Sequence, residues 1–327
     1  MPDLRRVFPG AGLRATPLSA SVQPAIAVAP SADEGVVRAL EMGGGRRSDP
    51  SDADGLVWTD AADPEGLRRL LEVSPARWVQ LPFAGIERFV AAGVIGADRT
   101  WTCAKGIYAA ATAEHALALM LAAARRLPMY ARLRSWTESE EGLERRLAGS
   151  TVVVFGAGGI GRALIAMLAP LGPEVVAVNR SGSAVRGART TVPAGELAGT
   201  LGGADWVVIT APLTPETKGL FGREMLARMG PRAWLVNVAR GGIVDTDALV
   251  DALRAGQIGG AALDVTDPEP LPDGHPLWSL DNALITPHVA NTWEMALPEL
   301  RGLVRRNVAH FAAGEPLEGV VDPATGY

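Results

Sequence analysis

The chain has 327 residues, of which 48% are hydrophobic and 20% charged, and its formal net charge at pH 7 is −5. This length allows two ordinary domains, each with its own core, and the acidic balance excludes a nucleic-acid-binding protein dominated by basic surface. Cys103 is the only cysteine, so an intrachain disulfide is excluded and nothing demands an oxidising compartment.

No stretch of the chain has the pattern of a membrane segment. The first 20 residues lack the apolar core of a signal peptide, and the most apolar helix candidate, Ala116–Ala124, is too short to span a bilayer. We therefore expect a cytoplasmic protein with neither a membrane nor a nucleic-acid partner.

The first third of the chain alternates short apolar strands with helical patterns, which is typical of parallel β/α units. Residues 1–24 have no clear period and are expected to follow the surface. The predicted order is a strand at Ala25–Ala29, a helix at Glu34–Met42, a turn-rich connection at 43–55, a strand at Gly55–Thr59, a helix at Pro64–Val73 and a strand at Arg77–Leu81. Residues 80–87 then pass through Pro82 and Gly85 to another helix start, where small anions often bind.

The pattern becomes helical from Thr112. A helix that is apolar almost all round is predicted over 113–126, which indicates burial between layers or domains. The following segment, Pro128–Leu147, is polar around Trp136. We interpret it as an arm that contacts the partner domain or a second subunit.

A second alternation begins at Thr151. Strands are predicted at Thr151–Phe155, Val175–Val178, Trp206–Thr210, Trp234–Val238, Gly260–Val265 and Ala283–Thr286, with helices at Arg162–Leu168, Gly222–Met229 and Thr246–Ala255. Six strands with crossovers match a doubly wound dinucleotide-binding sheet. After Pro298, Glu299–Ala313 is predicted as an amphipathic helix that returns to the first domain. We thus predict a discontinuous substrate domain, 1–112 and 298–327, around a dinucleotide-binding domain, 113–297.

A glycine turn follows the first strand of this second half. Gly156 permits a tight turn, Gly158 lets the backbone approach a pyrophosphate, and Gly161 lets the next helix pack closely, with its N-terminus toward the anion. Gly159 and Ile160 complete the turn. Such a motif alone is a weak signal, because glycine turns also serve as loops, but its place between an apolar strand and a helix strengthens it.

Asn179 stands eighteen residues after Gly161, where an NAD-specific site has Asp or Glu for the ribose 2′-hydroxyl. A carboxylate would repel a 2′-phosphate, whereas Arg180 can pair with it and Ser181 or Asn179 can donate hydrogen bonds. The sequence favours NADP(H). The alternative is a solvated turn that tolerates NAD(H).

Polar residues follow the last three predicted strands. Arg240 lies in the run 237–245, Asp264 and Glu269 lie in 264–270, and His288 lies in 286–292. Because ligands of open α/β sheets bind outside the carboxyl ends of the strands, Arg240, Glu269 and His288 are expected to converge on one crevice.

These motifs resemble the D-isomer-specific 2-hydroxyacid dehydrogenase family, in order: the glycine turn, PLTPETKGL at 212–220, NVARGGIVD at 237–245, DV…EP at 264–270 and TPHVA at 286–290. The resemblance is strong over about residues 75–300 and extends to the first part by layout. It implies an α/β protein with two doubly wound parallel-sheet domains, a Rossmann dinucleotide-binding domain and a flavodoxin-like substrate domain.

The resemblance also implies roles for individual residues. Arg240 would bind the substrate carboxylate and carbonyl, His288 would donate and accept the proton, and Glu269 would hold the imidazole. Asp264 would contact the nicotinamide carboxamide, and the backbone of Ala84 and Gly85 would anchor the carboxylate. The remaining cofactor-binding residues expected from these motifs are Ala211, Pro212, Thr217, Val238, Ala239, His288 and Ala290. Formate dehydrogenases of the same superfamily are similar but carry Gln at the position of Glu269, which speaks for a 2-hydroxy acid.

The chemistry of the reaction suits these side chains independently. Reduction of a 2-oxo acid needs a hydride at the carbonyl carbon and a proton on its oxygen, which a histidine can supply. A nearby glutamate favours the imidazolium and fixes the ring. An arginine binds two carboxylate oxygens with its planar fork while its charge polarises the carbonyl.

Simpler readings exist for several of these residues. Arg240 could cap a strand–helix turn, Glu269 could be a solvated loop charge, and Thr217 could serve a turn after Pro215. The remaining histidines, His115, His275 and His310, lack matching partners and are interpreted as structural or exposed. Asp245 or Thr246 is expected to cap the helix that follows. No cluster has metal-ligand spacing, so we predict no metal.

Taken together, the sequence predicts an NADP(H)-preferring enzyme that reduces small 2-oxo acids such as glyoxylate or hydroxypyruvate, and works as a homodimer. Phe83 and Trp293 are candidates for contact with the substrate side chain, but neither identifies the acid. The alternatives are a phosphoglycerate dehydrogenase-like enzyme and a non-catalytic dinucleotide sensor.

Overall fold

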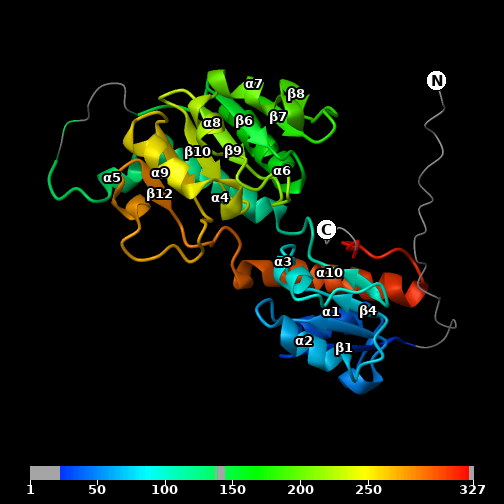
Figure 1. Cartoon of the computed structure of the whole chain (residues 1–327). Helices are drawn as coiled ribbons and strands as arrows, with labels where there is room; N and C mark the ends of the chain where they lie inside the picture. The colour runs from blue at the N-terminus through cyan, green and yellow to red at the C-terminus, as the bar shows by residue number, and fades with distance from the viewer. Residues whose placement is uncertain (1–22, 137, 139–143, 324–327) are drawn as a thin grey trace. The chain divides into compact units, whose positions relative to one another are not determined.

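The computed structural model describes residues 23–136, 138 and 144–323. The protein consists of two compact units (Figure 1): one contains the described residues up to Ile107 and those from Trp293 onward, and the other comprises Tyr108–Thr292. Both boundaries fall a few residues before the expected ones, because helices α4 and α10 begin earlier than expected. The segment expected to follow the surface, 1–24, lies almost wholly outside the described residues.

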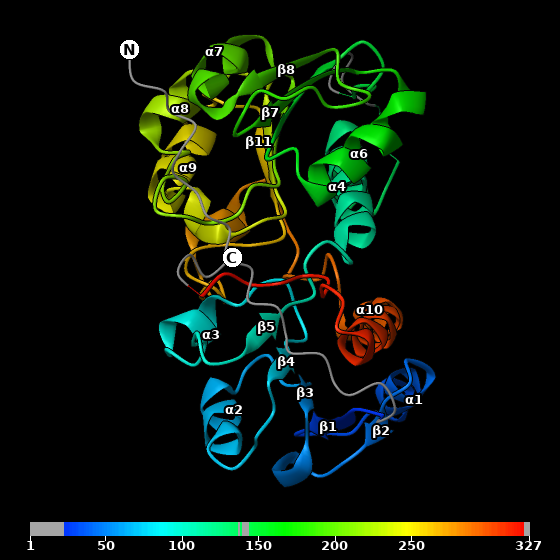
Figure 2. The same cartoon turned by 90° about the vertical axis from the view of Figure 1, so that its right-hand side faces the viewer.

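The first unit is a five-stranded parallel sheet with helices on both faces. Its elements are β1 (Ala25–Ala29), α1 (Glu34–Met42), β2 (Arg46–Arg47), β3 (Gly55–Trp58), α2 (Pro64–Leu71), β4 (Trp78–Gln80), α3 (Glu87–Ala91), β5 (Thr100–Thr102) and α10 (Trp293–Ala313). The strand order β2-β1-β3-β4-β5 is the flavodoxin-like order. Figure 2 shows α2 and α3 on one face of this sheet and α1 and α10 on the other. The predicted fold of this domain is confirmed.

Two strands of the first unit, β2 and β5, were not predicted. They are two and three residues long, and both residues of β2, Arg46 and Arg47, are exposed. Such short strands have no apolar run from which they could be recognised. The segment 43–55 therefore contains an edge strand within the turn-rich connection.

The second unit is a seven-stranded parallel sheet. Its elements are α4 (Ala109–Ala124), α5 (Leu127–Tyr130), β6 (Thr151–Phe155), α6 (Gly159–Leu168), β7 (Glu174–Asn179), β8 (Thr190–Pro193), α7 (Leu197–Thr200), β9 (Trp206–Ile209), α8 (Arg223–Ala227), β10 (Trp234–Asn237), α9 (Thr246–Arg254), β11 (Gly260–Leu263) and β12 (Ala283–Ile285). The order β12-β11-β10-β9-β6-β7-β8 is that of a doubly wound Rossmann sheet. The six predicted strands are confirmed, and β8 is an additional edge strand.

The central strand β6 explains why its sequence has no polar alternation. Successive side chains of a strand point to opposite faces. Val152 and Val154 pack with the side chains of α4 and α6, whereas Val153 packs on the other face with those of α8 and α9. Because both faces are covered, every inward position must be apolar. The glycine turn after Phe155 thus begins at the end of a strand that is covered on both faces.

Helix α10 starts at Trp293, so the prediction that it follows Pro298 was wrong. Pro298 lies inside the helix near its beginning, on an exposed position. A proline has no amide hydrogen to donate to the carbonyl four residues earlier, which here belongs to Glu294, and its ring crowds that carbonyl. One lost bond in the second turn is compatible with the helix. Within the described part of the chain, no helix is both long and apolar enough to cross a membrane.

Candidate active site

The turn between β6 and α6 contains three glycines, and the structural reason for glycine differs among these positions. Gly156 has a φ of 101°, and a Cβ there would lie 2.3 Å from the Ala211 backbone nitrogen. At Gly161, a Cβ would lie 2.7 Å from the Gly156 carbonyl oxygen. The packing of the protein itself therefore requires both residues to be glycine.

Gly158 is different, because a Cβ there would approach nothing closer than the Gly156 carbonyl oxygen at 3.9 Å. Gly158 is the N-cap of α6, and the first amides of the helix, those of Gly159, Ile160 and Gly161, have no partner within it. An open backbone surface at a helix N-terminus suits a pyrophosphate. The residues present thus fit a dinucleotide.

The turn after β7 is organised by Asn179. Its Nδ2 donates to the Ser183 carbonyl oxygen at 2.7 Å, and its Oδ1 accepts from the Ser181 amide at 3.2 Å. The hydroxyl groups of Ser181 and Ser183 lie 2.7 Å apart. Arg180 is exposed beside them. The turn presents hydroxyl groups and a guanidinium, with no carboxylate among residues 179–183.

The turn that carries Arg240 is fixed by residues that the sequence analysis did not single out. Asn237, which is 1% exposed, donates from Nδ2 to the Arg240 carbonyl oxygen at 2.9 Å and accepts from the Ala239 amide at 3.0 Å. At Gly241, a Cβ would lie 1.9 Å from the Thr266 carbonyl oxygen. Only glycine allows this approach, which brings the Arg240 turn against the segment leading to Glu269.

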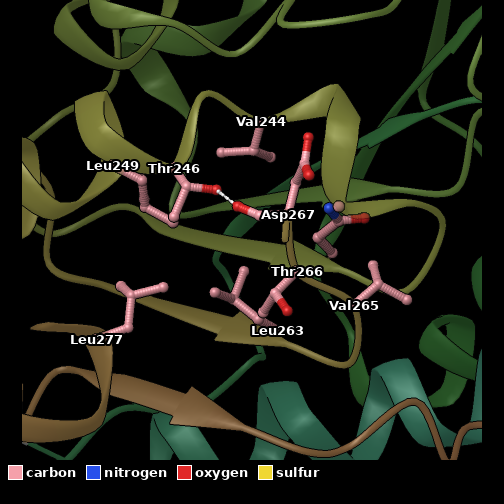
Figure 3. Close-up of a pocket in the computed structure, with 10 residues that line it drawn as sticks. Val244, Thr246, Leu249, Leu263, Val265, Thr266, Asp267 and Leu277 are labelled. Atoms are coloured by element: carbon pink, nitrogen blue, oxygen red, sulfur yellow. Dashed lines mark hydrogen bonds between the residues drawn. The ribbon is translucent and has the colours of Figure 1, made fainter. Parts of the chain in front are cut away.

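Figure 3 shows a small pocket to which both of these segments contribute residues and beside which Thr246 Oγ1 donates to the Asp267 carbonyl oxygen at 2.6 Å. Its labelled walls are mainly apolar, with Leu249, Leu263 and Leu277 among them. Asp245 caps α9 by accepting from the Ala248 amide at 3.0 Å, as predicted. We assign this pocket no ligand.

His288 and Glu269 form a direct hydrogen bond. His288 Nδ1 lies 2.7 Å from Glu269 Oε1, and the two side chains are 49% and 42% exposed. His288 has a φ of 52°, a left-handed conformation that residues other than glycine seldom adopt. Its amide donates to the Asp264 carbonyl oxygen at 2.8 Å. The imidazole is therefore both reachable from solvent and held by a carboxylate.

Asp264 holds the loop that follows β12. Its side chain is 1% exposed, and its carboxylate accepts from the Thr286 hydroxyl at 2.6 Å and from the Val289 and Ala290 amides at 2.9 and 3.0 Å. Burial opposes ionisation, but hydrogen bonds from His115, Thr286 and these two amides outweigh it and lower the Asp264 pKa from 3.8 to about 2. Asp264 thus forms hydrogen bonds with the backbone of His288 and of the two residues that follow it. Its contact with a nicotinamide carboxamide stays a prediction.

His115 is a largely buried histidine, in line with its interpretation as structural or exposed, but it has partners that the sequence did not indicate. Its Nε2 lies 3.0 Å from Thr286 Oγ1 and 3.3 Å from Asp264 Oδ1. His275 has a local role, because its Nδ1 accepts from the Leu277 amide at 3.3 Å. The third of these histidines, His310, lies 3.9 Å from Glu315.

The other expected cofactor residues lie at the carboxyl ends of neighbouring strands in the same sheet. Ala211 and Pro212 follow β9, Val238 and Ala239 follow β10, and Ala290 follows β12. The Thr217 hydroxyl accepts from the Thr214 amide at 2.7 Å and donates to the Pro212 carbonyl oxygen at 2.8 Å. These bonds favour a turn-forming role for Thr217. Within the described residues, no group of three or more His, Cys, Asp or Glu side chains could hold a metal ion.

The expected substrate loop belongs to the first unit and follows β4. The Ala104 amide donates to the Phe83 carbonyl oxygen at 3.2 Å, and the Phe83 ring lies 5.7 Å from that of Trp293 between centroids. At the base of the loop, the buried Gln80 donates to the Leu81 carbonyl oxygen at 2.9 Å. Ala84 and Gly85 thus follow a well-anchored strand end beside an aromatic pair.

A comparison of the chain with known protein families shows the family to which it belongs. The model of the D-isomer specific 2-hydroxyacid dehydrogenase NAD-binding domain matches residues 117–290. This protein belongs to the D-isomer specific 2-hydroxyacid dehydrogenase family. Its members are NAD(P)-dependent enzymes that act on the CH–OH group of D-2-hydroxy acids, so the predicted family and enzyme class are confirmed.

The chain is also similar to individual proteins. The chain is 40% identical over 306 residues to the uncharacterized protein in the proB 3′ region of Corynebacterium melassecola, covering 90% of this chain and 97% of the relative. It is 35% identical over 214 residues to D-3-phosphoglycerate dehydrogenase of Archaeoglobus fulgidus, covering 64% of this chain and 40% of that longer enzyme.

Two solved structures are similar over nearly the whole chain. A family member from Xanthobacter autotrophicus Py2, in complex with NADPH and MES, has a TM-score of 0.80 and 31% identity and covers 94% of this chain and 100% of its own. The NADPH-dependent glyoxylate/hydroxypyruvate reductase of Sinorhizobium meliloti, in complex with NADP and sulfate, has a TM-score of 0.75 and 26% identity, with coverages of 93% and 100%.

Proposed function

We propose that this protein reduces a small 2-oxo acid to the D-2-hydroxy acid, with NADP(H) as the preferred cofactor. The observation that carries the proposal is the 2.7 Å hydrogen bond between His288 and Glu269. This pair follows β11 and β12, at the same carboxyl edge of the sheet as the Gly156–Gly161 turn and the Arg240 turn. Ligands of doubly wound sheets bind at this edge.

The chemistry divides between the cofactor and the side chains. A bound nicotinamide dinucleotide would supply the hydride. Because His288 donates from Nδ1 to Glu269, its Nε2 is left to deliver a proton to the substrate oxygen, and Glu269 stabilises the imidazolium that carries this proton. Arg240 would bind the carboxylate of the acid and polarise its carbonyl. Toward the substrate, the chain thus has to bind one carboxylate and move one proton.

The cofactor preference rests on the turn after β7. A 2′-phosphate would find Arg180, the Ser181 hydroxyl and backbone amides there, without a carboxylate to repel it. The NADPH and NADP complexes of the two similar structures support this choice. NAD(H) is the alternative cofactor, because the same turn holds nothing that excludes a free ribose hydroxyl.

The substrate class rests on the first unit and on the relatives. We assign Ala84 and Gly85 to the substrate carboxylate, and Phe83 and Trp293 to the wall beside the substrate side chain, so that this unit is the substrate domain. The name of the Sinorhizobium meliloti enzyme supports glyoxylate and hydroxypyruvate. A phosphoglycerate dehydrogenase-like activity is the second candidate, favoured by the 35% identity to the Archaeoglobus fulgidus enzyme.

The assembly and the location are further parts of the proposal. In the arm Pro128–Leu147, of which 137 and 139–143 lie outside the described residues, Trp136 is 95% and Leu133 39% exposed. A tryptophan ring this exposed is the observation that favours contact with a second copy, because Trp is enriched at protein interfaces, and we propose a homodimer through this arm. The acidic chain with a single cysteine suits the cytoplasm.

The test is NADPH oxidation with glyoxylate, hydroxypyruvate, pyruvate and 3-phosphohydroxypyruvate, each repeated with NADH. We expect reduction of glyoxylate or hydroxypyruvate, with a higher kcat/KM for NADPH. A preference for 3-phosphohydroxypyruvate would select the second candidate. Tight cofactor binding without reduction of any acid would refute the enzyme assignment and favour a dinucleotide sensor.

A further inference from the structure

His115 connects helix α4 to the loop that carries His288. Its side chain is 20% exposed, and its Nε2 lies 3.0 Å from Thr286 Oγ1 and 3.3 Å from Asp264 Oδ1. Asp264 accepts the two amides that follow His288, and its backbone carbonyl accepts the His288 amide. A chain of hydrogen bonds therefore runs from α4 through one buried carboxylate to the backbone on both sides of the His288 ring.

The direction of these hydrogen bonds can be assigned from donor and acceptor chemistry. The Thr286 hydroxyl donates its single hydrogen to Asp264 Oδ1 at 2.6 Å, so its oxygen is left to accept from His115. The Asp264 carboxylate can only accept. Nε2 of His115 must therefore carry a hydrogen and act as the donor in both contacts. Without it, the buried carboxylate loses one of its donors, and such losses are costly because charged groups need full hydrogen bonding when buried.

We propose that His115 is a positioning residue for the reaction: its Nε2–H donates into the Asp264–Thr286 pair and thereby holds the 287–290 loop in the conformation that presents His288 to Glu269. The inference rests on the proposed function, because turnover is what the loop conformation serves. His288 has a φ of 52°, and conformations of this kind persist only where the surroundings over-determine them. Asp264 provides that constraint, and His115 orients Asp264.

Three substitutions separate a donor role from simple packing. His115→Leu removes the donor. In His115→Gln the side-chain amide reaches about as far as Nε2 and restores a donor, whereas in His115→Asn the amide reaches only about as far as Nδ1. His310→Leu is the matched control, because it makes the same replacement at a partly exposed histidine of the other unit. Each variant is measured for kcat, cofactor Kd and hydrogen exchange of the Val289 and Ala290 amides.

We expect His115→Leu and His115→Asn to lower kcat by about 10- to 100-fold and to accelerate exchange of the Val289 and Ala290 amides by about 10-fold. Cofactor Kd and exchange in β6 should stay near wild type, and His115→Gln should recover most of both losses. The proposal would be overturned if the Val289 and Ala290 amides exchanged at the wild-type rate in all variants. It would also be overturned if His115→Gln lowered kcat and accelerated amide exchange as much as His115→Leu does. If the wild-type protein reduced no 2-oxo acid, the proposed function would fail, while the exchange data would still decide the role of His115.

Discussion

Replacing Asp264 by asparagine tests whether this carboxylate holds the site together. The Asp264 pKa falls from 3.8 to about 2 in the folded protein, and each pKa unit corresponds to about 1.4 kcal/mol. Because the side chain is 1% exposed, solvent screening removes little of this energy, and ionised Asp264 contributes about 2.5 kcal/mol at neutral pH. An asparagine also turns an NH₂ group toward amides that themselves donate. We expect Asp264→Asn to destabilise the Tyr108–Thr292 unit by about 3 kcal/mol.

The pH dependence of this effect has a definite sign. The folded pKa lies below the unfolded value of about 4, so the stabilisation is complete above about pH 4 and is lost as the pH falls toward about 2. Asparagine does not titrate there. The stability difference between wild type and Asp264→Asn should therefore be constant from pH 7 to about pH 5 and narrow below pH 4.

The assay is amide hydrogen exchange in β6, β9 and β10, because a chain with two units need not unfold in a single transition. Asp281→Asn is the matched control. Asp281 belongs to the same unit, and its side chain is 96% exposed, so this change should alter stability by less than about 0.5 kcal/mol. Wild-type stability of Asp264→Asn at pH 7, or a difference that does not narrow in acid, would refute the reasoning.

Three further substitutions test the turns around the site. Arg180→Ala should weaken NADPH about 10- to 100-fold in a binding titration and leave NADH nearly unchanged; equal losses would contradict the 2′-phosphate assignment. Glu269→Gln should lower kcat about 10- to 100-fold with little change in cofactor Kd, and an unchanged kcat would show that the carboxylate is dispensable. Gly156→Ala should destabilise the second unit by about 3 kcal/mol or more in amide exchange, whereas Gly195→Ala, with nothing near its Cβ position, should be nearly neutral.

The parts of the fold that could be predicted are those that have a recognisable pattern in a short stretch of sequence. β6 and its neighbours are covered on both faces, so their sequences are continuous apolar runs. The glycine turn is likewise local, because the φ of Gly156 and the approach of Gly161 leave their signature in a six-residue motif. The edge strand β8 is TTVP, only partly buried, and no such run marks it.

Residues of the candidate site could be proposed from the sequence where a family motif contains them, and could not where a contact distant in the sequence gives the residue its role. His115 and Thr286 are 171 residues apart in the sequence, and no periodicity links them. Asn237 and Gly241 lie within a quoted motif, but their roles depend on carbonyl oxygens of the folded turn and of Thr266. The early start of α10 was hidden because a proline near a helix start resembles a boundary.

The most direct test of the central claim compares wild type with His288→Ala, at saturating NADPH, with the 2-oxo acid that the wild-type protein reduces best. Loss of the group that delivers the proton should lower kcat by about 100- to 10,000-fold. The Kd for NADPH should stay close to wild type, because His288 contributes its imidazole to the reaction and the Gly156–Gly161 turn holds the dinucleotide. Turnover of His288→Ala at the wild-type rate would contradict the account.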